Sequence, residues 1–559
     1  MATIAEALQL ALAHHRGGRL SDAEAAYRQI LASDPRNVEA LNNLGTVLED
    51  QGHHVEAAVC LERALTLAPN SGVLHFNLAN ALRAAGQCGR ALAGYRQALV
   101  LVPNFAACHN NLGRLQMETG DLAGAQRSFE EAVRIDPVHA DAHYNLGALS
   151  QDRGDLDAAR TSYQRAIALR ADHAVAHYNL GMVCQAQRDW DAARAAFVEA
   201  LRIRPDYVQP HCNLGAMLLA FGEDQRALAH FEHALEIDPD CAEAHFNRGL
   251  VLLGCGDYAA GWPEYAWQFR CPSYSGSKFD QPAWDGSQLS GRTILITCGS
   301  GLGDTLQLAR YASEVRQRGA GEILFAAQDV LHPLLAEAGL GELVSPRAQD
   351  LEFDVHVSLM ELPYVFGSTD ETIPAAPYLA AGESLVAKWR ERLSGLDGFR
   401  VGIAWQGNPE YLWDHLRSIP LAEFEPLART RGVRLISLQR AAGCEQLPLL
   451  AGRFAVTDLG EDVDREAAFV DTAAIIANLD LVIASDSAVA HLAGATGAPV
   501  WVALPRGAYW RWQRARDTTA WYSSMRLFRQ VSVGNWTSIF NEMAEKLPSI
   551  VHSKQATGR

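Results

Sequence analysis

The N-terminal half of the sequence repeats itself every 34 residues, and this period constrains the fold more than any other feature. A self-similarity of this length is typical of a solenoid of helix–turn–helix units. Stacked units bury their core between neighbours and present a long concave groove, so the period predicts an all-α solenoid. The period is clearest in a column of asparagines: Asn43, Asn77, Asn111, Asn145, Asn179, Asn213 and Asn247.

Small residues and prolines also recur at fixed places in each unit. With Val38 as position 1, glycine or alanine recurs at position 8 and alanine at positions 20 and 27. Small residues let two helices approach closely, and proline at position 32 marks the break before the next unit. These positions resemble the tetratricopeptide repeat over residues 4–270, with a degenerate first copy that makes eight units. Aromatic side chains fill the remaining gap: Tyr95, Phe129, Tyr163, Phe197 and Phe231.

The asparagine column has two interpretations. It lies on the first helix of each unit, which in this family usually lines the groove, and amide groups could bind the backbone of an extended protein or peptide acceptor. Alternatively, the amides bond only to the neighbouring helix. A histidine column at position 4 is expected to face a peptide or solvent, because its members are too far apart to share a metal ion: His75, His109, His143, His177, His211 and His245.

Composition excludes several classes of function. The net charge of −17 argues against a nucleic-acid partner, since phosphate binding needs a basic face. The 10 cysteines form no CxxC pair and predict reduced thiols instead of a disulfide frame or a zinc site. Residues 1–12 lack the basic start of a secretory signal, and no run of 18 apolar residues predicts a membrane span. We therefore expect a cytoplasmic protein.

The periodicity ends near residue 270. Residues 271–290 are rich in Pro, Ser and Gly and predict a linker, and residues 531–559 are expected to form a C-terminal helix and tail. Between them, apolar β-rich runs alternate with helical stretches in two blocks, 291–385 and 398–530, which predicts parallel α/β sheets. The expected strands are Thr293–Thr297, Glu322–Ala326, Arg400–Ala404, Val433–Leu438, Leu481–Ala484 and Val500–Ala503, with a helix from about Asp304 to Arg318.

Two Rossmann-like halves are the arrangement of GT-B glycosyltransferases, and ligands of such sheets bind beyond the carboxyl ends of the strands. The loop after the first strand contains Gly301 and Gly303 and ends in Asp304, without the Lys-Ser/Thr of a P-loop. It resembles the ADP-heptose:lipopolysaccharide heptosyltransferase family, whose first loop carries a similar Gly-Asp. The resemblance implies that Asp304 is the general base and that the two glycines lie at the donor. The alternative is that Asp304 caps the following helix.

A second loop, Ala484–Pro499, is similar to the pattern D-T-G-x-x-H-L-A-A-A-x-G-x-P of the same family. Ser487 and Ala488 replace its Thr and Gly. Backbone N–H groups at the start of the expected helix would bind the donor diphosphate. Asp486 either contacts the donor ribose or holds the loop, and His491 either contacts the donor or packs to orient the loop.

Three further segments supply donor contacts in this interpretation. Trp405 and Asn408 follow another predicted strand, and Ser418 stands next to Arg417. Arg417 is expected to neutralise a donor phosphate. Gln439, at the end of the next strand, is expected to contact the nucleotide base.

Arg511 is a further contact for phosphate or acceptor, whereas its neighbours Trp510 and Trp512 are expected to pack between domains. Asp462-Val-Asp464 spells the DxD metal motif of GT-A enzymes, but the same spelling occurs twice within the repeats, at Asp155 and Asp189. We therefore expect no metal site.

The combined expectation is a multidomain protein, an all-α tetratricopeptide solenoid followed by an α/β GT-B domain. It would transfer a sugar from a nucleotide-diphosphate donor to an acceptor hydroxyl, with inversion and no cofactor beyond the nucleotide sugar. This plan resembles that of the protein O-GlcNAc transferases, although the site motifs resemble the heptosyltransferases more. One alternative is a non-catalytic scaffold with a degenerate GT-B domain, and another is a heptosyltransferase-like enzyme of surface glycan assembly.

Overall fold

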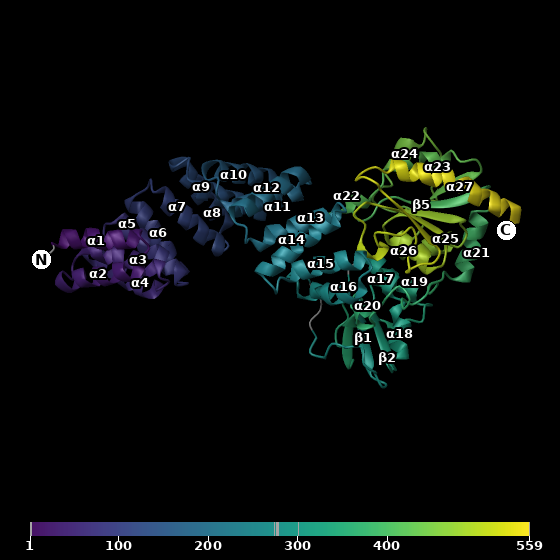
Figure 1. Cartoon of the computed structure of the whole chain (residues 1–559), viewed down its shortest axis with the longest axis horizontal. Coiled ribbons are helices and arrows are strands. Elements are labelled where there is room, and N and C mark those ends of the chain that lie inside the picture. The colour runs from purple at the N-terminus through teal and green to yellow at the C-terminus, as the bar shows by residue number, and fades with distance from the viewer. Residues whose placement is uncertain (1–2, 273, 275–278, 300, 558–559) are drawn as a thin grey trace. The chain divides into compact units, whose positions relative to one another are not determined.

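The computed structural model describes residues 3–272, 274, 279–299 and 301–557 of the chain (Figure 1). The chain divides into two compact units, Met1–Pro210 and His211–Arg559, which are described separately. The first unit is built from helices, and the second begins with helices and continues with two parallel sheets.

Helices α1 to α16 form eight consecutive pairs, as the sequence period predicts. Their bounds are α1 (Ile4–Arg16), α2 (Leu20–Ser33), α3 (Val38–Asp50), α4 (His54–Leu67), α5 (Gly72–Ala84), α6 (Cys88–Leu101), α7 (Ala106–Glu118), α8 (Leu122–Ile135), α9 (Ala140–Asp152), α10 (Leu156–Leu169), α11 (Ala174–Ala186), α12 (Trp190–Ile203), α13 (Val208–Ala220), α14 (Asp224–Ile237), α15 (Ala242–Gly254) and α16 (Tyr258–Tyr265). A short 3-10 helix, η1 (Ala266–Arg270), follows α16.

Glycine at position 8 is required by the packing within most pairs, whereas the α5–α6 pair has Ala79 there, opposite Gly94. A Cβ atom on Gly113 would lie 2.6 Å from the ring of Phe129, and one on Gly181 would lie 2.5 Å from the ring of Phe197. Both rings are fully buried. The predicted close approach of the two helices is therefore present, and any larger residue at position 8 would displace the aromatic ring.

The first sheet of the second unit has the strand order β3-β2-β1-β4, and every pairing in it is parallel. Its strands are β1 (Thr293–Thr297), β2 (Glu322–Ala326), β3 (Glu342–Leu343) and β4 (Val355–Ser358). Leu295 of β1 lies opposite Leu324 and His356, which sets the register. The helices of this part are α17 (Leu302–Leu308), α18 (Tyr311–Gln317), α19 (His332–Leu335), α20 (Leu362–Val365) and the 3-10 helix η2 (Asp329–Leu331).

The second sheet has the order β6-β5-β7-β8-β9 and is also parallel throughout. Its strands are β5 (Phe399–Ala404), β6 (Val433–Ser437), β7 (Leu481–Ser485), β8 (Val500–Leu504) and β9 (Met525–Arg529). Its helices are α21 (Glu383–Arg392), α22 (Asp414–Arg417), α23 (Glu425–Ala428), α24 (Gln446–Leu450), α25 (Val470–Ile476), α26 (Ala488–Ala495), α27 (Thr537–Thr557) and the 3-10 helices η3 (Leu421–Phe424) and η4 (Trp510–Trp512).

The single helix expected from about Asp304 to Arg318 is divided into α17 and α18, so that prediction was wrong in detail. Arg310 lies at the break, where its buried guanidinium donates to the carbonyl oxygens of Gln307, Pro374 and Trp521. Trp521 belongs to the part of the chain that carries the second sheet. Arg310 therefore links the two sheet-bearing parts of the unit.

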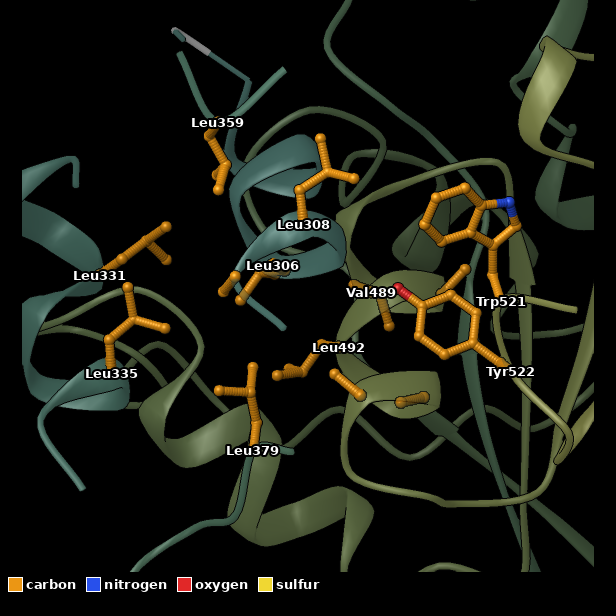
Figure 2. Close-up of a cluster of buried hydrophobic side chains, with 14 of the residues drawn as sticks. Leu306, Leu308, Leu331, Leu335, Leu359, Leu379, Val489, Leu492, Trp521 and Tyr522 are labelled. Carbon is orange, nitrogen blue, oxygen red and sulfur yellow. The ribbon is translucent and has the colours of Figure 1, made fainter. Parts of the chain in front are cut away.

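One hydrophobic core continues from the first sheet to the second. Figure 2 shows Leu306 and Leu308 of α17 close to Val489 and Leu492 of α26, with Leu379 beside them. The backbone N–H of Leu379 donates to the carbonyl of Ala495 at the end of α26 (3.2 Å). Because α17 follows β1 and α26 follows β7, this core brings the loops after these two strands together.

Candidate functional site

The strand order determines where a ligand can bind in each sheet. In open parallel sheets, ligands bind beyond the carboxyl ends of the strands at which the chain order reverses. These are β1 and β4 in the first sheet and β5 and β7 in the second. The predicted donor contacts follow β1, β5 or β7, except Gln439, which follows β6.

The loop after β1 lies directly against the start of α26. A Cβ atom on Gly303 would lie 3.3 Å from Cδ2 of His491 and 3.4 Å from Cα of Ala488. Gly301 is the N-cap of α17, and a Cβ atom there would lie 2.5 Å from Oδ2 of Asp304. Both predicted glycines therefore allow the close approach of the β1 loop, Asp304 and α26.

Asp304 pairs with an arginine 207 residues away in sequence. Its Oδ1 accepts a hydrogen bond of 2.5 Å from Nη2 of Arg511 in η4. Asp304 lies within the first turn of α17, and the N-cap position belongs to Gly301, so the capping alternative was wrong. The Asp304 side chain is 33% exposed and that of Arg511 is 9% exposed. The carboxylate is therefore accessible from solvent, whereas the arginine is held beneath it.

The guanidinium of Arg511 is charged, and one of its hydrogen-bond donors has no partner among the described residues. Burial alone would lower its pKa, but Asp304, Tyr509 and Asp486 together raise the pKa above its ordinary value. Within the described part of the chain, its Nε atom has no hydrogen-bond partner. A buried cation with a spare donor is suited to bind an anionic group.

Two tyrosines lie at the same cluster and are missing from the sequence prediction. The Arg511 guanidinium lies 4.6 Å from the ring centre of Tyr509, and that of Arg417 lies 4.9 Å from the ring centre of Tyr411. Burial raises the pKa of Tyr411, and the charges that act on it are those of Arg417, Asp486, Arg511 and Asp304. Tyr411 thus marks the place where charged residues from the loops after β1, β5, β7 and β8 converge.

Arg417 and Ser418 are held by a buried carboxylate that the sequence analysis did not single out. Asp414 is 3% exposed, accepts from Nε of Arg417 (3.0 Å) and accepts from Oγ of Ser418 (2.8 Å). Ser418 in turn accepts from the backbone N–H of Gly407 (3.2 Å). A Cβ atom on Gly407 would collide with Asp414. Ser418 therefore closes the β5 loop, and Asp414 orients Arg417.

Trp405 and Gln439 have a different place from the predicted one. Trp405 is fully buried in the core of the second sheet, where its indole N–H donates to the Gly443 carbonyl (3.2 Å). Gln439 accepts from the backbone N–H groups of Trp405 (2.9 Å) and Gln406 (3.0 Å) and donates to the Ala442 carbonyl (2.8 Å). Both side chains hold the loops in shape instead of pointing at a ligand.

Three other predicted contacts, Asn408, Ser487 and Asp486, lie in the loops after β5 and β7. Asn408 accepts from the backbone N–H of Glu410 (3.0 Å) and so shapes its own turn. Ser487 is the N-cap of α26, and Asp486 beside it is 7% exposed.

His491 packs within the core, which agrees with the second of its two interpretations. It is 2% exposed, stacks on Trp512 with ring centres 5.2 Å apart, and its Nδ1 lies 3.2 Å from the hydroxyl of Tyr522. Burial, followed by the charges of nearby arginines, lowers the pKa of His491 well below its ordinary value. This shift favours the neutral imidazole, and the packing of His491 orients α26.

The asparagine column is engaged in hydrogen bonds between repeats. Asn77 donates to Asn42 (2.8 Å), Asn111 to Asn80 (2.9 Å), Asn145 to Asn110 (2.8 Å) and Asn179 to the hydroxyl of Tyr144 (3.1 Å). Asn43 accepts from Asn42 (3.2 Å), and Asn247 donates to the Glu243 carbonyl within its own helix (2.8 Å). Asn213 is engaged as well. The amide donors thus support the structural interpretation, while all seven side chains stay partly exposed.

The histidine column also has a structural role that the sequence analysis missed. Nε2 of His75 lies 3.0 Å from the carbonyl oxygen of Pro69, six residues earlier, and the same contact recurs at His109, His143, His177 and His245. A carbonyl oxygen only accepts, so each imidazole carries its proton on Nε2. These histidines bind the turn between consecutive repeats, and most of them stay partly exposed, so this structural role stands beside the predicted peptide-facing or solvated one.

Two kinds of feature are missing from the described residues. No group of three or more His, Cys, Asp or Glu side chains there is placed to hold a metal ion. None of the helices in this part of the chain combines the length and the apolar composition needed to cross a bilayer.

The N-terminal part of the chain matches two family models, each described as tetratricopeptide repeat. One matches residues 138–206 and 173–240, and the other matches residues 8–72, 76–125 and 110–150. The repeats of this part are therefore tetratricopeptide repeats, and they indicate a protein-binding scaffold.

The chain is also similar to one curated protein, Protein FlbA of Caulobacter vibrioides. The two are 26% identical over 320 residues, a region that covers 52% of this chain and 52% of FlbA. The chain thus spans about half the length of the curated relative that it matches.

Similar solved structures include MamA and YrrB. MamA is 28% identical, covers 30% of this chain and 97% of its own, and has a TM-score of 0.28. YrrB, described as a TPR protein with an unusual peptide-binding site, is 24% identical, covers 33% of this chain and 95% of its own, and has a TM-score of 0.30. At these TM-scores the two structures carry no argument about this chain.

Proposed function

We propose that the C-terminal unit is a GT-B-type glycosyltransferase that transfers a sugar from a nucleotide-diphosphate donor to an acceptor hydroxyl, with inversion. One observation carries the proposal: Asp304, Arg511 and the start of α26 converge from separate parts of the chain at the switch points of two parallel sheets. An accessible carboxylate beside a buried cation is what proton abstraction with departure of a diphosphate needs.

In this proposal the acidic Asp304 acts on the acceptor, and the basic residues act on the donor diphosphate. Asp304 takes the proton of the acceptor hydroxyl as the sugar is transferred. Arg511, Arg417 and the backbone N–H groups at the start of α26 stabilise the leaving diphosphate, because cations and a helix N-terminus both favour anions. Asp486 contacts the donor ribose or holds the β7 loop. Two arginines can neutralise the diphosphate charge, and this scheme therefore uses no metal ion.

The ion pair between Asp304 and Arg511 has a consequence for this scheme. While this pair holds, Oδ1 of Asp304 is occupied by the hydrogen bond from Nη2 of Arg511. A donor diphosphate would compete for the spare donors of Arg511 and loosen its hold on Asp304. Donor binding before acceptor binding follows from this competition.

The tetratricopeptide repeats would bind a protein or peptide acceptor. Their family match and the partial exposure of the asparagine column support this role. A non-catalytic scaffold is the second proposal, and the replacement of the family's Thr-Gly by Ser487-Ala488 favours it. Under that proposal the repeats bind a partner protein and the second unit turns over no donor.

A panel of nucleotide sugars separates the two proposals. The purified chain is mixed with uridine-, guanosine-, adenosine- and cytidine-based donors, and sugar release and thermal stabilisation are measured for each. Enzymatic function predicts both stabilisation and sugar release with at least one donor. If no donor stabilises the chain or is turned over, the scaffold is the better account.

A further inference from the structure

Arg511 reaches Asp304 from a loop that also contacts the last two repeats. This loop, residues 505–517, follows β8 and contains η4. The last two repeats, α13 to α16, belong largely to the same compact unit as the sheets, because that unit begins at His211. Their buried side chains Leu253, Tyr258 and Trp262 share one hydrophobic core with Trp510 and Trp512 of η4.

The first contact is between backbones. A Cβ atom on Gly507 would collide with the carbonyl of Ala220 at the end of α13. Gly222, in the turn after α13, has a φ of +74°, and a Cβ atom there would lie 2.8 Å from Cγ of Arg506. Glycine on both sides lets the loop lie directly on the turn between α13 and α14.

The second contact is a bidentate ion pair. Nε and Nη2 of Arg514 donate to the two carboxylate oxygens of Asp224, over 2.6 Å and 3.2 Å. Each side chain is only 18% exposed, so solvent screens this pair less than an exposed one. The backbone N–H of Arg514 also donates to the carbonyl of Gly254 at the end of α15 (2.9 Å). The same arginine is thus held by both of the last two repeats.

The third contact is made by the two residues that flank Arg511 most closely among those that touch α16, Trp510 and Gln513. Gln513 donates to the hydroxyl of Tyr258 in α16 (2.8 Å) and has a φ of +45°, which non-glycine residues rarely adopt. Trp510, on the other side of Arg511, packs edge-on against Trp262 with ring centres 5.2 Å apart. A strained backbone persists only where the surroundings hold it, so the repeats keep η4 in place.

We propose that the last two repeats position Arg511 for the reaction, with Asp224 and Arg514 as the positioning residues. The inference rests on the proposed glycosyltransferase function. Neither positioning residue touches Asp304, and both act through the loop that carries Arg511. The solenoid therefore contributes to catalysis as well as to binding an acceptor.

The test uses Asp224→Asn in the full-length chain, which removes the charge and keeps the shape. Amide hydrogen exchange of residues 505–517 is expected to become faster, and kcat with the donor that the wild-type chain turns over is expected to fall about ten- to hundred-fold, as misplacement of a catalytic group does. Asp240→Asn, on the exposed turn after α14, is the matched control and should change neither quantity.

A charge exchange separates positioning from general damage to the fold. Asp224→Arg alone and Arg514→Asp alone should each lower kcat, and the double variant should recover most of it, because the ion pair is restored with its signs reversed. Unchanged exchange in Asp224→Asn, or faster exchange with an unchanged kcat, would overturn the inference. Absence of turnover in the wild-type chain would instead refute the proposed function, and the exchange data would still report whether the repeats hold the loop.

Discussion

The repeats and the two-sheet part of the chain use their polar residues in opposite ways. In the repeats, the same residue at the same position makes the same contact several times over, as the histidines do with the carbonyl six residues earlier. Around the sheets, single residues such as Asp304 and Arg511 come from distant parts of the chain and meet once. A residue that recurs with the period of the repeat therefore indicates a packing role. A catalytic site is to be expected where segments distant in sequence converge.

The comparison predicts that substitutions at the convergent cluster act on turnover, whereas those in the repeats act on stability in small, separate steps. The largest effect is expected at Arg511. Arg511→Lys keeps the charge but loses the planar fork that bonds Asp304 and, in the proposed function, would also bond a donor phosphate. Steady-state turnover should fall about a hundred- to a thousand-fold, as on removal of one donor to a developing anion. Arg526→Lys, at a more exposed arginine on β9, should be neutral, and equal rates for all three proteins would disprove the role of Arg511.

A histidine outside the periodic column should make the second unit sensitive to acid. Burial, then the charges of His211, Arg226 and His233, lowers the pKa of His230 from 6.5 to about 4. The unfolded chain takes up this proton near pH 6.5 and the folded unit only near pH 4, so the stabilisation is complete above pH 6.5 and is lost as the pH falls towards 4. Because the imidazole is partly exposed, solvent screening reduces the loss to about 1–2 kcal/mol.

Urea unfolding of His230→Gln between pH 4 and 7 measures this effect. The variant should lose most of the pH dependence that the wild-type chain shows in this window. His552→Gln, at an exposed histidine of α27, is the control and should keep the wild-type profile. A wild-type profile in His230→Gln would show that other groups cause the acid sensitivity.

Within the repeats, the largest effect is expected where glycine faces an aromatic ring. Gly113→Ala inserts a methyl group against Phe129 and should destabilise the first unit by about 1–3 kcal/mol, the usual cost of overpacking. Gly89→Ala in α6 meets nothing within 4 Å and should be neutral or stabilising by up to about 1 kcal/mol. Denaturant titration compares the two, and equal effects would contradict the packing role of position 8.

The smallest effect is expected in the histidine column. His143→Leu removes one hydrogen bond, to the Pro137 carbonyl, and should cost about 1 kcal/mol of unfolding free energy. His75→Leu should cost a similar amount, and the double variant should show the sum, because the two sites are independent. Chemical denaturation measures all three. A column that served only to bind a peptide would leave stability unchanged.

The sequence predicted whatever is local or periodic. The helix breaks, the small residues at position 8 and strands such as β1 and β2 follow from patterns within a few residues or from the 34-residue period. Strands β3 and β4, and β9 with its two arginines, carry weak patterns and were not recognised. The division between α17 and α18 depends on Arg310, whose partners lie far away in sequence.

The site was predictable only as a set of loops. Glycines and polar residues after strands identified Gly303, Asp304 and Asp486. The residues of the Asp304–Arg511 pair and of the Asp224–Arg514 pair are separated in sequence by more than half the length of the second unit. A single sequence contains no pattern that predicts such pairs. Trp405 and Gln439 were predicted to contact the donor because they follow strands. Their side chains are buried in the structure and support the loops instead.

The central claim is that Asp304 carries the chemistry, and one comparison of rates tests it most directly. With a donor that the wild-type chain turns over, Asp304→Asn keeps an acceptor for Arg511 but cannot take a proton, so kcat should fall about a hundred- to ten-thousand-fold while donor binding by calorimetry stays near the wild-type value. Asp462→Asn, at an exposed carboxylate of the DxD sequence, should match the wild-type chain. Undiminished turnover in Asp304→Asn would contradict the account.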